Sequence, residues 1–114
     1  MAEQSKSPAR PRQSDFASTA SIADGLLPLR PGDLTFAHAR ALVDEVVTVD
    51  EDRLRDAVRY VAREARILVE PSGGASVAAV LQRYGAALDA ARPVVAILSG
   101  GNIALDEIAA ILAG

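Results

Sequence analysis

The chain has 114 residues, of which half are hydrophobic and only 4% aromatic, and its formal net charge is −3. This acidic balance argues against a nucleic-acid partner, and the absence of cysteine excludes disulfides and thiolate metal sites. No apolar run approaches the roughly 18 residues of a membrane helix, so we expect a cytoplasmic protein with no membrane association.

The N-terminal residues 1–21 are predicted to form a disordered tail. They are rich in Ser, Pro, Arg and Gln, and Phe16 is their only aromatic residue, so they bury too little surface to repay the entropy of ordering. Residues 22–114 form the predicted ordered domain. A helix is expected over residues 34–43, where apolar residues recur at helical spacing and Asp33 is placed to cap the first turn.

The middle of the chain alternates between strand and helix patterns. Residues 45–49 are typical of a short strand. Asp50 is a favourable N-cap for the next helix, because acidic residues follow it at the positive end of the helix dipole. One face of this helix is apolar, and it consists of Leu54, Ala57, Val58, Val61, Ala62 and Ala65.

Two more strands and two more helices complete the pattern. Residues 67–69 form a short apolar stretch, and a helix is predicted from Ser72. The continuous apolar run at residues 94–98 is typical of a strand buried on both faces, as in a parallel sheet, and a closing helix follows at 105–113. This alternation predicts an α/β fold with parallel strands.

The sharpest local motif is Ser99-Gly100-Gly101-Asn102, directly after the third predicted strand. In open α/β sheets, ligands bind beyond the carboxyl ends of strands, so a hydroxyl followed by two glycines is well placed to meet a ligand. A tight turn explains the same residues, because Gly and Asn readily adopt positive φ. The motif alone leaves both interpretations open.

A second motif is the carboxylate and glycine-rich helix start at residues 70–74. Free N–H groups at such a helix start can hold a phosphate, whereas the alternative is that Ser72 caps the helix and the glycines permit close packing. The single histidine, His38, has neither cysteines nor suitably spaced carboxylates around it, so no metal site is predicted.

Five segments, taken in chain order, resemble the threonine dehydratase, serine dehydratase and serine racemase family, which consists of fold-type II pyridoxal-phosphate enzymes related to the tryptophan synthase β chain. The resemblance covers about four fifths of the chain and implies a partial three-layer α/β fold, the C-terminal fragment of such an enzyme. The segments are residues 22–26, 31–36, 42–49, 67–73 and 95–103.

The resemblance also implies a set of cofactor-binding residues. Ser99 matches the serine beside the pyridine nitrogen of pyridoxal phosphate, the backbone of Gly25 would pass close to the cofactor, and Glu70 would lie on the polar side of the ring. Unlike a carboxylate, a hydroxyl does not keep the ring nitrogen protonated, so the ring is a less extreme electron sink. The implied reaction of the full-length family is elimination from serine or threonine to a 2-oxo acid and ammonia.

The family's Schiff-base lysine and its glycine-rich phosphate loop are both missing. Lys6 is the only lysine, and nothing in its polar surroundings would lower its pKa as a reactive amine requires. We therefore assign no catalytic residue, expect weak or no binding of pyridoxal phosphate, and expect no catalysis by this chain alone. Two alternatives are a non-catalytic interaction module that pairs with itself or with a partner chain, and an unrelated ligand-sensing βαβ domain.

Overall fold

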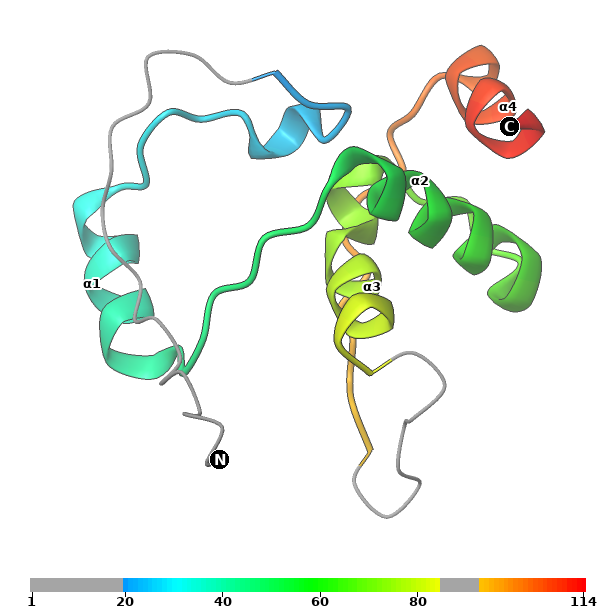
Figure 1. The fold of residues 1–114 in the computed structure, drawn as a ribbon. Helices are drawn as coiled ribbons and strands as arrows, with labels where there is room; N and C mark the ends of the chain where they lie inside the picture. The colour runs from blue at the N-terminus through cyan, green and yellow to red at the C-terminus, as the bar shows by residue number, and fades with distance from the viewer. Residues whose placement is uncertain (1–19, 85–92) are drawn as a thin grey trace, which may run out of the picture. The chain divides into compact units, whose positions relative to one another are not determined.

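The computed structural model describes residues 20–84 and 93–114, so nearly all of the predicted tail at residues 1–21 lies outside the described residues. Within these ranges the chain is helical (Figure 1). The α-helices are α1 (Asp33–Leu42), α2 (Glu51–Tyr60), α3 (Pro71–Tyr84) and α4 (Leu105–Ala113), with a 3-10 helix at Asp24–Leu26 and a π-helical turn at Val61–Ala65. Contacts divide the described chain into two units, one at Pro28–Val47 and one that combines Ala20–Leu27 with Thr48–Gly114.

The first unit contains α1, and the helix predicted at residues 34–43 is confirmed. Its predicted cap is wrong: Gly32 is the N-cap residue and makes no side-chain cap hydrogen bond. Asp33 is instead the first residue of the helix, and its carboxylate pairs with Arg30 at 2.6 Å. No residue of α1 is buried. His38 is exposed, and its Nδ1 lies 2.8 Å from the Leu34 carbonyl oxygen.

The second unit is built around α2, whose start was correctly predicted. The Asp50 side chain accepts a hydrogen bond from the backbone N–H of Arg53 at 2.8 Å, which satisfies one of the free donors of the first turn. The apolar face is buried at Leu54, Ala57 and Val58. The helix continues through the π-helical turn and ends at Arg66, which adopts a left-handed conformation with φ of 60°.

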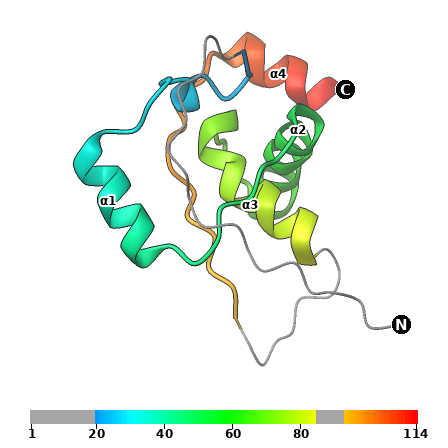
Figure 2. The same cartoon turned by 60° about the vertical axis from the view of Figure 1, so that its left-hand side comes forward.

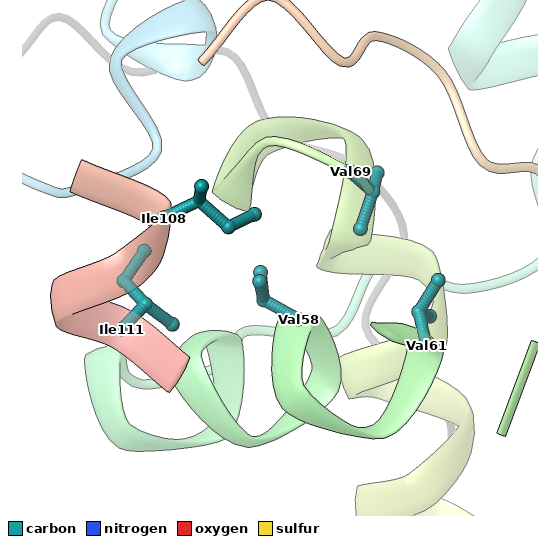
Figure 3. Close-up of a cluster of buried hydrophobic side chains, with 5 residues drawn as sticks. All are labelled: Val58, Val61, Val69, Ile108 and Ile111. Atoms are coloured by element: carbon teal, nitrogen blue, oxygen red, sulfur yellow. The ribbon is translucent and has the colours of Figure 1, made fainter. Parts of the chain in front are cut away.

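A cluster of aliphatic side chains packs α4 on α2, together with one residue of the π-helical turn and one residue that precedes α3 (Figure 3). Its members are Val58, Val61, Val69, Ile108 and Ile111. Arg59 adds a polar link between the same helices, because its Nε donates to the Ile111 carbonyl oxygen at 2.7 Å while its guanidinium pairs with Asp56 at 3.1 Å. Arg59 thereby satisfies one of the carbonyls left free at the end of α4.

A second buried cluster attaches the segment Ala20–Leu27 to α2 and α3. It consists of Ala23, Leu54, Ala57 and Ala78. The backbone N–H of Ile22 donates to Glu51 Oε2 at 3.0 Å, so a carboxylate at the start of α2 fixes the same segment.

This carboxylate makes the attachment dependent on pH. The Ser21 hydroxyl and the Ile22 N–H donate hydrogen bonds to Glu51 and lower its pKa. Because the folded-state pKa lies below the unfolded value, the stabilisation is complete above the unfolded pKa and is lost as pH falls through the folded pKa. We expect the thermal midpoint to fall less in Glu51→Gln than in the parent chain between about pH 5 and pH 3. Circular dichroism melts of both proteins at pH 7, 5 and 3 would measure the two falls in thermal midpoint. Equal falls in the parent chain and in Glu51→Gln would contradict the role of Glu51.

The strands predicted at residues 45–49, 67–69 and 94–98 are not found: the described residues contain helices, turns and extended segments but no hydrogen-bonded strand. A strand requires a ladder of backbone hydrogen bonds with a neighbour. The described residues form one such bond just beyond the ends of the second and third segments, from Glu70 N–H to the Gly100 carbonyl oxygen, and it is long at 3.4 Å. Figure 2 shows residues 93–104 as an extended segment along α3.

Candidate functional site

The residues predicted to surround a cofactor all lie at the N-terminal end of α3. Glu70 directly precedes this helix, Ser99 and Gly100 lie against its first turn, and Gly25 is bonded to its second residue. The prediction that Ser72 opens the helix is off by one residue, because α3 begins at Pro71, which suits the first helical position. The structure therefore brings together three segments that are distant in sequence.

The contact between Gly73 and Ser99 is the closest of these approaches. A Cβ atom added to Gly73 would overlap the Ser99 carbonyl oxygen, lie 2.8 Å from the Ser99 carbonyl carbon and lie 2.9 Å from Val69 Cγ2. Only a residue without a side chain allows the backbone after the 94–98 segment to approach α3 this closely. The Ser99 residue itself remains exposed.

Gly100 makes a similar approach to Glu70. Its φ is +85°, in the region that favours glycine, and an added Cβ would overlap the Glu70 carboxylate. The Glu70 N–H donates to the Gly100 carbonyl oxygen, so both the backbone and the side chain of Glu70 meet the turn after Ser99. Glu70 is half-buried and Ser99 is exposed. The Ser99–Asn102 motif thus has positive φ at Gly100, as a turn would, and its backbone at Gly100 lies against the Glu70 carboxylate.

Gly25 is fixed through Ser72. Its backbone N–H lies 2.9 Å from Ser72 Oγ and 2.7 Å from Asp24 Oδ1. The Ser72 hydroxyl lies 3.5 Å from the same Asp24 oxygen. The hydroxyl of Ser72 accordingly joins α3 to the 3-10 helix, a role that sequence reasoning missed because the two residues are 47 positions apart. An added Cβ on Gly25 would lie 2.9 Å from Ser72 Oγ.

A second serine of α3 was also missed. Ser76 Oγ donates to the Ile97 carbonyl oxygen at 2.6 Å and holds the 94–98 segment on the helix. The only signal in the sequence is the spacing of Ser72 and Ser76, which places both hydroxyls on one face of a helix.

These residues can offer a cofactor one hydroxyl and one carboxylate. The exposed Ser99 hydroxyl can donate or accept a hydrogen bond, and the Glu70 carboxylate can accept. The backbone N–H of Gly25 already has oxygen partners, so what Gly25 can offer is close approach of its backbone. No lysine occurs in residues 20–84 or 93–114, and Lys6 lies outside them. At this end of α3 the described residues therefore offer one hydroxyl, one carboxylate and a close backbone approach, and the described residues include no lysine.

Cavities and metal-ligating groups are the other features that could mark a site among the described residues of the second unit. Two surface cavities, of about 340 and 270 Å³, are lined mainly by residues of α2, α3 and α4, and neither includes the three predicted residues. In the part of the chain that the structure describes, no group of three His, Cys, Asp or Glu residues is arranged to hold a metal ion. Among the same residues, no helix is both long enough and apolar enough to cross a membrane.

Comparison with known proteins identifies the family to which the chain belongs. The model of a family described as pyridoxal-phosphate dependent enzyme matches residues 2–100. The chain belongs to this family of pyridoxal-phosphate dependent enzymes, as its sequence motifs predicted.

Within the family, similar proteins include threonine ammonia-lyases and serine racemases. The L-threonine ammonia-lyase of Thermotoga maritima is 38% identical over 89 residues, which are 77% of this chain and 21% of that enzyme. The serine racemase of Oryza sativa subsp. japonica is 37% identical over 91 residues, 77% of this chain and 26% of the racemase. The crystal structure of the T.th. threonine deaminase superposes with a TM-score of 0.73 and 35% identity, over 82% of this chain and 33% of that chain.

The chain therefore spans only about a fifth to a third of the length of these relatives. The match to solved structures supports the predicted relationship to fold-type II enzymes, and in the described residues the predicted helices form whereas the predicted strands do not.

Proposed function

We propose that the chain is a truncated threonine/serine ammonia-lyase-like protein and does not catalyse the elimination by itself. In full-length enzymes of this kind, pyridoxal phosphate supplies the electron sink for β-elimination of a hydroxy amino acid to a 2-oxo acid and ammonia. The observation that carries the proposal is the meeting of Ser99, Glu70 and Gly25 at the start of α3 in a chain whose only lysine is Lys6.

Each of these residues has a proposed part in cofactor binding. Ser99 would hydrogen-bond the pyridine nitrogen without forcing its protonation, because a hydroxyl can donate as well as accept. Glu70 would face the polar side of the ring, and the Gly25 backbone would lie against the cofactor. Gly73 and Gly100 would set the position of Ser99, since a side chain on either glycine would displace the turn. That residues 1–21 are a disordered tail, that residues 22–114 are the C-terminal part of a pyridoxal-phosphate-dependent domain and that the protein is cytoplasmic stay predictions.

The proposal predicts that the purified chain does not bind pyridoxal phosphate covalently. A titration followed by visible absorbance should show no cofactor band beyond that of free pyridoxal phosphate. Incubation with L-threonine or L-serine should yield no 2-oxo acid, whereas the Thermotoga maritima enzyme assayed in parallel should produce it. Formation of 2-oxo acid by this chain would refute the proposal, and its loss in Lys6→Ala would then identify Lys6 as the reactive amine.

A second candidate function is a non-catalytic module that pairs with another chain. The observation in its favour is the exposure of apolar side chains in the 94–98 segment, where Val95 is 85% and Ile97 74% exposed.

A further inference from the structure

A surface cavity of about 340 Å³, which we call the arginine cavity, lies along one flank of α2. Its walls come from α2, from the π-helical turn and from α3, which contacts α2 (Figure 1). Arg53, Tyr60 and Arg63 line it at positions that recur on one side of a helix. Small-molecule sites usually enclose about 300–1,000 Å³, so the cavity is large enough for a compact ligand.

Two guanidinium groups of the arginine cavity have no partner within the described residues. Arg59 pairs with Asp56 at 3.1 Å and donates to the Ile111 carbonyl oxygen. Arg53 and Arg63 are exposed, and among the described residues neither side chain forms an ion pair or a hydrogen bond. Arginine keeps its charge in proteins and has only donors. The two groups therefore bring fixed positive charge and free N–H donors to one cavity.

The charges that line the arginine cavity favour a ligand with one negative charge. Three arginines lie beside two carboxylates, Asp56 and Glu64, so the lining is left with one excess positive charge. The whole chain has a formal net charge of −3, so this local excess runs against the general balance. A monoanion would neutralise the excess, whereas a dianion such as phosphate would reverse it.

The rest of the lining includes apolar side chains that match the body of an organic ligand. Tyr60 is 49% exposed, and Leu81 contributes an aliphatic side chain from α3. A ligand that covers these side chains removes apolar surface from water, which favours binding. An inorganic anion would leave this part of the cavity uncovered.

We propose that the arginine cavity binds a small monocarboxylate with a compact apolar body. The planar guanidinium groups of Arg53 and Arg63 offer paired N–H donors, a geometry that suits the two oxygens of a carboxylate. Tyr60 and Leu81 would contact the apolar body. None of the residues proposed to meet pyridoxal phosphate lines this cavity, so the inference goes beyond the proposed function and does not depend on it.

An NMR titration of the complete 114-residue chain with benzoate would test the proposal. Benzoate is an aromatic monocarboxylate, and benzyl alcohol is a neutral ligand of similar shape. We expect saturable amide shifts at residues 53–64 and 78–81, with a dissociation constant on the order of 1 mM because the cavity lies at the surface. Benzyl alcohol should bind at least about fivefold more weakly, because it offers the guanidinium groups no charge.

A matched pair of double variants would locate the site. Arg53→Gln/Arg63→Gln should weaken benzoate binding at least about tenfold, because it removes both unpaired cations. Arg40→Gln/Arg55→Gln makes the same change in net charge at residues outside the cavity and should bind benzoate as the parent chain does. None of the four side chains belongs to a buried cluster, so circular dichroism should show that both variants remain folded.

Any of four results would overturn the proposed carboxylate site. These are equal binding of benzoate and benzyl alcohol, shifts that do not saturate up to about 50 mM benzoate, shifts confined to residues outside the cavity, and equal affinities of the two double variants. The proposed function fails by a different result, namely 2-oxo acid formation by the isolated chain. An inert chain that binds no benzoate would refute the carboxylate site alone.

Discussion

Gly73→Ala is expected to destabilise the folded chain by about 3 kcal/mol or more, at the upper end of the effects of overpacking. The added methyl group would overlap the Ser99 carbonyl oxygen and crowd Val69 Cγ2. Backbone atoms cannot move aside as the end of a flexible side chain can, so the 94–98 segment would have to separate from α3. Urea unfolding followed by circular dichroism at 222 nm would measure the loss.

The next residue supplies a matched control. Gly74→Ala makes the same chemical change one position along α3, where the added Cβ would lie 3.6 Å from Val58 Cγ2 and 3.8 Å from Val69 Cγ1. These are ordinary packing distances, and alanine favours a helix interior over glycine by about 0.5–1 kcal/mol. Gly74→Ala should therefore be neutral or stabilising. Equal stability of the two variants would mean that Ser99 does not pack on Gly73 as described.

Val58→Ala should cost about 2 kcal/mol, because it removes buried methyl groups and leaves a cavity. Val58, on α2, is fully buried and belongs to the cluster that also contains Ile108 and Ile111 of α4 (Figure 3). The described core contains few large side chains, so neighbouring residues have little volume with which to fill the space. Thermal and urea unfolding of the variant and the parent chain would give the difference in free energy of unfolding.

Val95→Ala is the control for this substitution. It removes the same atoms from a side chain that is 85% exposed, so the free energy of unfolding should change by less than about 0.5 kcal/mol. A loss as large as that of Val58→Ala would show that Val95 is buried in the isolated chain.

Sequence patterns predicted the helices well because helical hydrogen bonds are local. The start of α2 was read from Asp50 and its buried face from residues spaced three and four apart, and α4 agrees with the predicted residues 105–113. Strands form only with a hydrogen-bonded neighbour, so an apolar run such as residues 94–98 predicts a strand only when the rest of a sheet is present. The described part of the chain contains no such neighbour.

The candidate site was predictable in its residues but not in its contacts. Ser99, Glu70 and Gly25 were singled out by family resemblance, and the structure gathers their backbones at α3. What the sequence could not show is the pairing of Gly73 with Ser99, of Gly100 with Glu70 and of Ser72 with Gly25. Each is a contact between segments at least 26 positions apart, set by tertiary packing rather than by local pattern.

The packing of α4 on α2 has a consequence for folding during synthesis. Val58 and Arg59 take their partners from Ile108 and Ile111, about fifty residues later in the chain. Until residues 105–113 have been synthesised and can reach α2, Val58 has no partner from α4 and faces water on this side. Because contacts distant in sequence form late, the aliphatic cluster stays open on this side throughout that interval. Chaperones that bind exposed Val and Ile would meet the chain then, before α4 closes the cluster.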